Sequence, residues 1–123
     1  MANNYLYDEQ IIVGKTVKYT ENINNEELLL YFTDGSSCKF YHIYDCSEYV
    51  YIEDSDDLSL LKGVTLTGIT KEKSDKLTLN GLSTLTKLEF INEKRTVKVT
   101  WLGESNGYYS EDVDFQFFPA EED

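Results

Sequence analysis

The fold of this chain is decided by one stretch in its first half, LLLYFTDGSSCKFYHIY, residues 28–44. Leu28 to Thr33 form a compact apolar run, and the Asp34-Gly35 pair that follows is among the strongest short signals for a β-hairpin turn. The return strand is expected at Ser37 to Tyr44. An antiparallel hairpin at this point indicates a protein built mainly from β-strands.

Further strand signals lie on both sides of this hairpin. Tyr49 to Glu53 places Val50 and Ile52 on one face and polar or aromatic residues on the other, which is typical of a half-buried strand. Other strands are expected at Thr16 to Thr20, Val64 to Thr70, Leu88 to Ile91, Thr96 to Leu102 and Tyr109 to Phe118, with turns at Asn92 to Arg95 and Gly103 to Gly107.

One or two short helices are also expected. Leu58 to Leu61 follow an acidic turn and precede Gly63, a pattern that indicates one or two helical turns, and Tyr5 to Val13 form either a short helix or an irregular lead-in. The sum predicts a mainly β fold with minor α content. We expect an antiparallel sheet bent into a sandwich or an open barrel.

The 123 residues are expected to form a single domain, residues 1–123. Within it, residues 1–13 are interpreted as the lead-in segment and residues 119–123 as an acidic tail. Residues 72–87 are interpreted as a loop insertion, because Lys71 to Lys87 is polar and interrupted by Asn80-Gly81; a poorly fixed hairpin is the alternative. One proline and no Gly/Ser-rich run argue against an interdomain linker.

Charge is the strongest global feature of the sequence. The chain has 11 Lys and Arg against 23 Asp and Glu, a formal net charge of -12. Such a chain is not expected to bind nucleic acid directly or to bind an anionic membrane, since both need clustered Lys and Arg. It is attracted instead to basic surfaces, including the nucleic-acid channels of other proteins. Solubility alone is the alternative explanation.

The sequence predicts a cytoplasmic protein with reduced thiols. Its first residues show neither a basic segment nor an apolar segment of a secretory signal. No apolar stretch approaches the roughly 20 residues that a membrane span needs. Two cysteines are too few for a disulfide scaffold.

One cluster of residues has the chemistry of a metal site: Cys38, His42, Asp45, Cys46 and Glu48. Residues four apart on a straight strand are about 13 Å apart, which is too far for one zinc ion. The site therefore requires a turn near Asp45 that brings His42 together with Asp45 or Cys46. Three alternatives remain open: a locally hydrogen-bonded histidine with inert cysteines, a Cys38–Cys46 disulfide, and a Cys–His nucleophilic pair.

Two acidic runs are candidates for a binding surface. Glu53 to Asp57 follows a strand, and Asp112 and Asp114 are expected on one face of the last strand, about 7 Å apart. Such carboxylates can compete with nucleic acid for a groove lined by Lys and Arg. A cation site and a solvated face are the alternatives. With the tyrosines that flank the runs, the expected partner-binding residues are Glu53, Asp54, Asp56, Asp57, Tyr108, Tyr109, Glu111, Asp112 and Asp114.

Two stretches, 41–54 with the following residues 57–63, and 99–115, resemble a family of small proteins carried by phages and mobile elements of bacteria. The first block of that family usually reads His-x-x-Asp-Cys-Cys-Glu, and here Ser47 replaces the second cysteine. The resemblance implies a compact β-rich fold and a polar site that keeps His42, Asp45, Cys46 and Glu48, with structural zinc as the expected metal. It also implies a phage setting.

In size, acidity and lack of a catalytic motif, the chain is similar to anti-CRISPR inhibitors of type II RNA-guided nucleases. We therefore expect a protein without enzymatic activity, which binds a type II CRISPR effector nuclease through its acidic, tyrosine-rich surface and blocks loading of target DNA. One alternative is a protein that sequesters a nucleotide signal, although only Arg95 and scattered lysines are available to bind phosphate. A metal-dependent hydrolase is another.

Overall fold

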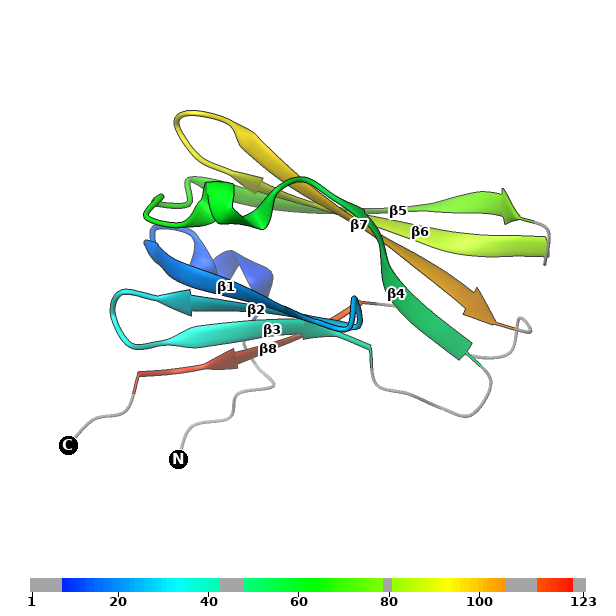
Figure 1. The fold of residues 1–123 in the computed structure, drawn as a ribbon, viewed down its shortest axis with the longest axis horizontal. Helices are drawn as coiled ribbons and strands as arrows, with labels where there is room; N and C mark the ends of the chain where they lie inside the picture. The colour runs from blue at the N-terminus through cyan, green and yellow to red at the C-terminus, as the bar shows by residue number, and fades with distance from the viewer. Residues whose placement is uncertain (1–7, 43–47, 79–80, 106–112, 121–123) are drawn as a thin grey trace.

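Two antiparallel sheets form the two layers of the molecule (Figure 1). The computed structural model describes residues 8–42, 48–78, 81–105 and 113–120. The strands of the described residues are β1 (Val17–Ile23), β2 (Glu27–Phe32), β3 (Ser37–Tyr41), β4 (Glu48–Ser55), β5 (Gly68–Thr78), β6 (Gly81–Ile91), β7 (Thr96–Ser105) and β8 (Asp114–Phe118).

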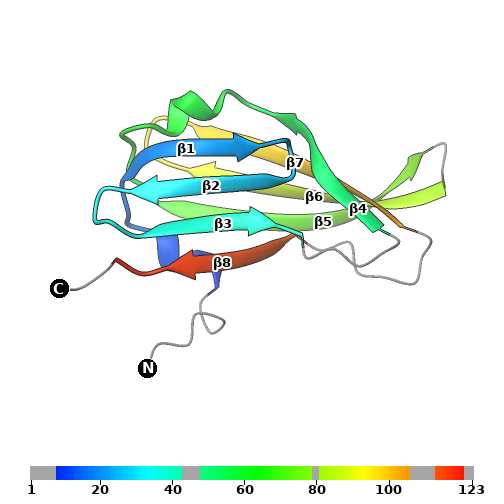
Figure 2. The same cartoon turned by 60° about the horizontal axis from the view of Figure 1, so that its bottom comes forward.

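Each sheet has four strands. The first has the order β1-β2-β3-β8, seen side by side in Figure 2, and the second has the order β4-β7-β6-β5. Every strand pairs antiparallel with its neighbours. The mainly β, antiparallel prediction is therefore confirmed. The sheets are not closed into a barrel, so the sandwich is the correct one of the two predicted architectures.

The core fills the space between the two sheets. Alternation along the strands places Val50 and Ile52 in the core while Tyr49 and Glu53 are exposed, as the sequence predicts. The sheets meet through Phe40 of β3 and Phe90 of β6, whose rings pack edge to face at 5.6 Å. Edge-to-face packing of buried aromatic rings adds to the stabilisation that comes from area burial alone.

The hairpin of β2 and β3 turns at Asp34-Gly35, as predicted. Gly35 has a φ of 91°, a left-handed conformation that glycine adopts without strain. The Asp34 carboxylate accepts hydrogen bonds from the backbone N–H and the hydroxyl of Ser36, and it pairs with the Lys15 ammonium. These interactions connect the turn to the segment before β1.

Asp34→Asn is expected to lower the free energy of unfolding at neutral pH by about 0.5–1 kcal/mol, a value that allows for the half-exposed carboxylate. Hydrogen bonds from Lys15 and Ser36 lower the pKa of Asp34 from 3.8 to about 2. The stabilisation is thus complete above the unfolded pKa and is lost as the pH falls toward 2. Urea unfolding of both proteins at neutral pH and near pH 2 measures this effect. The same difference in free energy of unfolding at the two pH values would contradict it.

The predicted short helices are single 3-10 turns, η2 (Glu9–Ile12) and η3 (Leu58–Leu61). Each begins after an aspartate, Asp8 or Asp57, whose carboxylate accepts a hydrogen bond from the second N–H of the turn. Residues 5–7 of the predicted lead-in and residues 121–123 of the predicted tail lie outside the described residues.

The interpretation of residues 72–87 as a loop insertion is wrong. Residues 72–78 and 81–87 belong to the paired strands β5 and β6, which stay in register from Gly68 opposite Ile91 to Thr78 opposite Gly81. Polar residues form strands here because they pair across the ladder, mostly charged residues with Thr or Ser and in one case the opposite charges of Glu72 and Lys87. The alternative interpretation, a hairpin, is the correct one.

Two predicted boundaries near the C-terminus also change. Gly103 pairs with both Val50 and Thr84, so β7 continues through Gly103 to Ser105. The prediction of a tight turn that begins at Gly103 is therefore wrong for residues 103–105. The last strand begins at Asp114 in the described residues. Residues 106–112, which contain the rest of the predicted turn and the first part of the predicted strand, lie outside them.

Candidate functional site

The described parts of residues 41–54 and 99–115 form neighbouring strands. β3 pairs with β8, with Tyr41 opposite Asp114, and β4 pairs with β7, with Glu48 opposite Ser105. Segments far apart in the chain therefore meet at the ends of these strand pairs. The described residues of the predicted metal site, His42 and Glu48, lie at these strand ends.

His42 follows β3 directly and is almost completely buried, with a side chain that is 3% exposed. Its Nδ1 lies 4.0 Å from Oδ2 of Asp114, the first residue of β8. The two groups form an ion pair only when the imidazole carries a proton. Asp114 was predicted as a partner-binding residue. The structure places its carboxylate beside a buried imidazole, which sequence spacing did not indicate.

The predicted zinc ligands are described only in part. Asp45 and Cys46 lie outside the described residues, and Glu48 is the first residue of β4 without a described side chain. In the part of the chain that the structure describes, no three His, Cys, Asp or Glu side chains come together as metal ligands. His42 and Asp114 together offer one nitrogen and one carboxylate, both suitable for zinc.

Cys38 lies away from this polar end, inside the core. It pairs with Leu30 on one side and Phe117 on the other, and its side chain is fully buried. Burial raises the pKa of the Cys38 thiol well above its ordinary value, which keeps it protonated and unreactive. β3 is a regular strand from Ser37 to Tyr41, so Cys38 and His42 are about 13 Å apart and cannot share one zinc ion.

The acidic run Glu53 to Asp57 divides into two pairs with different environments. Glu53 and Asp54 are exposed residues of β4. Asp56 accepts a hydrogen bond from the backbone N–H of Lys98, and Asp57 accepts hydrogen bonds from the backbone and hydroxyl of Ser59. The Ser59 hydrogen bonds also lower the pKa of Asp57.

Tyrosine rings lie next to the exposed acids of β4. Tyr49 and Tyr51 are stacked, with ring centroids 4.8 Å apart, and Tyr49 is 45% exposed. Glu104 of β7 is directly opposite Tyr49. The remaining predicted partner-binding residues, Tyr108, Tyr109, Glu111 and Asp112, lie outside the described residues.

A second stacked pair, which sequence analysis missed, lies on β1 and β2. Tyr19 and Tyr31 are directly opposite each other, with centroids 4.3 Å apart, and the Tyr31 hydroxyl donates to the Glu21 carboxylate at 3.1 Å. Only the register of the two strands reveals this pair. The backbone N–H of Ile52 in β4 donates to the carbonyl of Asn25 just after β1, which places the two edge strands together.

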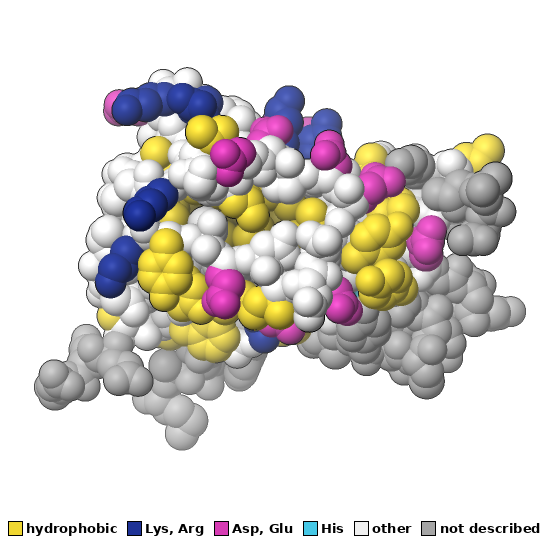
Figure 3. Space-filling model, viewed as in Figure 1, with side chains coloured by type: hydrophobic (Ala, Val, Ile, Leu, Met, Phe, Trp, Pro, Cys, Tyr) yellow, Lys and Arg dark blue, Asp and Glu magenta, His cyan; other side chains and the backbone are white. Residues whose placement is uncertain are grey.

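We define the tyrosine–acid surface as these two stacked pairs and the acids beside them. Figure 3 shows hydrophobic side chains over β1 and over β4 on one side of the molecule, with Asp and Glu side chains around them. The arrangement offers flat aromatic area next to negative charge. The surface consists of Tyr19, Glu21, Tyr31, Tyr49, Tyr51, Glu53 and Asp54.

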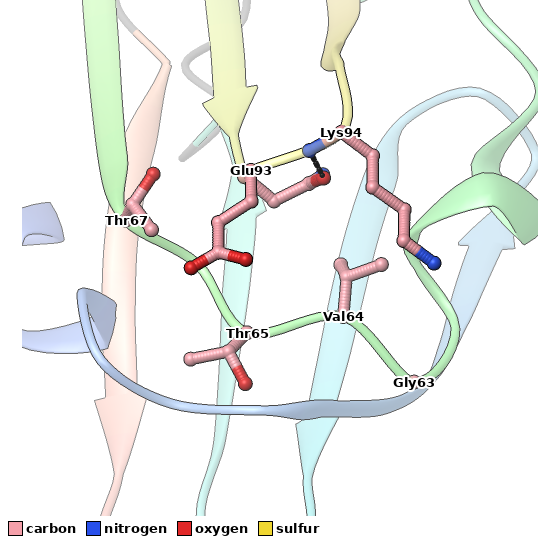
Figure 4. A pocket seen from close by; sticks show the side chains of 7 residues that line it. Gly63, Val64, Thr65, Thr67, Glu93 and Lys94 are labelled. Atoms are coloured by element: carbon pink, nitrogen blue, oxygen red, sulfur yellow. Dashed lines mark hydrogen bonds between the residues drawn. The ribbon is translucent and has the colours of Figure 1, made fainter.

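A cavity of about 380 Å³ lies elsewhere, where the segment before β5 passes the β6–β7 turn. In Figure 4 the Glu93 carboxylate and the Lys94 ammonium lie on either side of Val64, and the backbone N–H of Lys94 donates to Oδ1 of Asn92. One lysine beside one glutamate is a poor phosphate site. The cavity is lined by Gly63, Val64, Thr65, Thr67, Asn92, Glu93 and Lys94.

Fold and surface together define a two-sheet β-sandwich protein that presents tyrosines and carboxylates to its surroundings. Within this class, the chain belongs to the family described as a domain of unknown function (DUF7448), which matches residues 10–115. No curated protein and no solved structure matches the chain. No helix in the described residues is long and apolar enough to cross a membrane.

Proposed function

We propose that the protein is a phage anti-CRISPR inhibitor that acts in the host cytoplasm by binding a type II CRISPR effector nuclease. In this proposal the tyrosine–acid surface occupies the positively charged channel in which the nuclease holds nucleic acid, and target DNA is not loaded. The protein acts by binding and catalyses no reaction. The partner is a protein with a basic nucleic-acid-binding surface.

The observation that carries this proposal is the stacked pair Tyr49–Tyr51 beside Glu53 and Asp54 on a paired strand. Tyrosine gives a large contact area at little cost in side-chain entropy and keeps a polar tip for hydrogen bonding. Because β4 pairs with β7, the strand that carries these side chains is in place before the partner arrives. Preorganisation lowers the entropy that binding costs.

Net charge adds a long-range contribution. A net charge of -12 attracts the inhibitor to a basic channel and raises the association rate at low salt. The same charge excludes the inhibitor from the DNA itself. Competition is therefore expected between the inhibitor and target DNA for the nuclease, with no complex between inhibitor and DNA.

A structural zinc ion is part of the proposal, with His42, Asp45, Cys46 and Glu48 as its ligands. Elemental analysis of the purified protein is expected to find about one zinc per chain, and His42→Ala is expected to lose it, because structural zinc sites usually have four ligands. Cys38→Ala is the control, since Cys38 lies in the core and should leave the zinc content unchanged. Zinc-free wild-type protein would remove this part of the proposal.

The inhibitor proposal is tested by competition for the nuclease loaded with its guide RNA. Preincubation with saturating protein is expected to abolish binding of labelled target DNA. The quantity measured is the binding of target DNA, not its cleavage, by gel shift or fluorescence anisotropy. Unchanged DNA binding across a panel of type II nucleases would overturn the proposal.

A further inference from the structure

The outer face of β1 and β2 presents aromatic rings that the core does not use. Tyr19 is 45% exposed, and its ring stacks on Tyr31 with an interplanar angle of 18°. Glu21 lies two residues after Tyr19 on the same side of β1, and its carboxylate accepts the Tyr31 hydroxyl. The result is a flat aromatic pair with a fixed carboxylate at its margin.

The same sheet already holds a cation in a similar arrangement. Lys39 of β3 places its ammonium 4.5 Å from the centroid of the Tyr41 ring and 4.0 Å from the Glu27 carboxylate. This face thus already places a cation over a tyrosine ring and beside a carboxylate, an arrangement that attracts cations. In the described part of the chain, no lysine or arginine lies over Tyr19 or Tyr31.

We propose that Tyr19, Tyr31 and Glu21 form a receptor for an arginine side chain of a basic protein partner. The guanidinium stacks on the exposed tyrosine ring and donates hydrogen bonds to the Glu21 carboxylate. Arginine fits better than lysine, because its planar group can stack and bind a carboxylate at the same time. A second copy of this chain is disfavoured as the occupant, since each copy carries a net charge of -12.

This inference deepens the proposed function by naming the partner side chain that the tyrosine–acid surface recognises, and it rests on that function only for the identity of the partner. The site adds three residues to those that the sequence indicated. It also places arginine recognition on the sheet opposite to β4. A basic segment that reaches both sheets would contact both tyrosine pairs.

The test uses the full chain and two capped hexapeptides, one with alternating glycine and arginine and one with glycine and lysine. Titration at low salt, followed by fluorescence anisotropy of the labelled peptide, is expected to show tighter binding of the arginine peptide by about three- to fivefold. Tyr19→Leu and Glu21→Gln should each remove most of this preference. Glu93→Gln, which makes the same charge change in the β6–β7 turn, should keep it.

Three outcomes would overturn the arginine site. The first is equal affinity of the wild type for both peptides. The second is an equal loss of arginine preference in Glu21→Gln and in Glu93→Gln. The third is self-association of the chain that Tyr19→Leu abolishes. Glu21→Gln changes no side-chain shape, so it tests the site even if Tyr19→Leu folds poorly. Arginine preference without DNA competition would refute only the nuclease proposal, and DNA competition without arginine preference would refute only the arginine site.

Discussion

Replacing Phe40 by alanine is expected to lower the free energy of unfolding by about 3–5 kcal/mol, the range for large-to-small changes of buried aromatic residues. Phe40 is 1% exposed and joins three strands of both sheets. It packs edge to face on Phe90 of β6 and lies 5.1 Å, between centroids, from Phe115 of β8. Removing the ring leaves a cavity between the sheets that the rigid strands cannot close.

Urea unfolding followed by fluorescence measures this loss, under the two-state behaviour expected of one small domain. Phe118→Ala is the matched control, because Phe118 of β8 belongs to the same sheet as Phe40 but is only partly buried, opposite Ser37. Its loss should be about 1 kcal/mol. Equal losses in the two variants would mean that the core does not lie between the sheets as described.

The second large effect is expected from neutralising the acids of β4. Glu53→Gln combined with Asp54→Asn should weaken binding to the nuclease by about tenfold or more at low ionic strength, because charge complementarity governs both association rate and specificity. The effect should shrink as salt rises, since both residues are exposed. The free energy of unfolding should change by less than about 1 kcal/mol, because both carboxylates are exposed.

The control for this effect is Asp75→Asn combined with Glu93→Gln. It makes the same change in net charge, but Asp75 lies on β5, at the opposite edge of the sheet from β4. An equal loss of affinity in both double variants would show that overall charge, and not the tyrosine–acid surface, attracts the nuclease. Asp56 and Asp57 are unsuitable here, because their carboxylates hold the Lys98 backbone and the η3 turn.

The sequence predicts those parts of the fold that depend on local patterns. Asp34-Gly35 predicts the hairpin turn because Gly35 adopts a left-handed conformation, and the alternation around Val50 and Ile52 predicts which face of β4 is buried. The polar residues of β5 and β6 predict a loop, although the structure pairs them as a hairpin. Its stability comes from cross-strand pairing, such as that of Glu72 with Lys87, which needs the register.

The candidate site could be predicted only where its residues are close in sequence. The acidic run predicts Glu53 and Asp54, because both lie in one short segment of the sequence. Tyr19 and Tyr31 were missed because they meet only across β1 and β2. The roles of Asp56 and Asp114 depend on Lys98 and His42, partners far away in the chain, which no local pattern indicates.

One measurement decides whether carboxylates on a rigid β-sandwich act as a substitute for phosphate. Binding of target DNA to the guide-loaded nuclease is titrated with wild-type protein and with the Glu53→Gln/Asp54→Asn variant at low ionic strength. We predict that the wild type displaces DNA and that the variant needs about tenfold more protein to do so. Equal potency of the two proteins, or no displacement by either, would contradict the proposed mechanism.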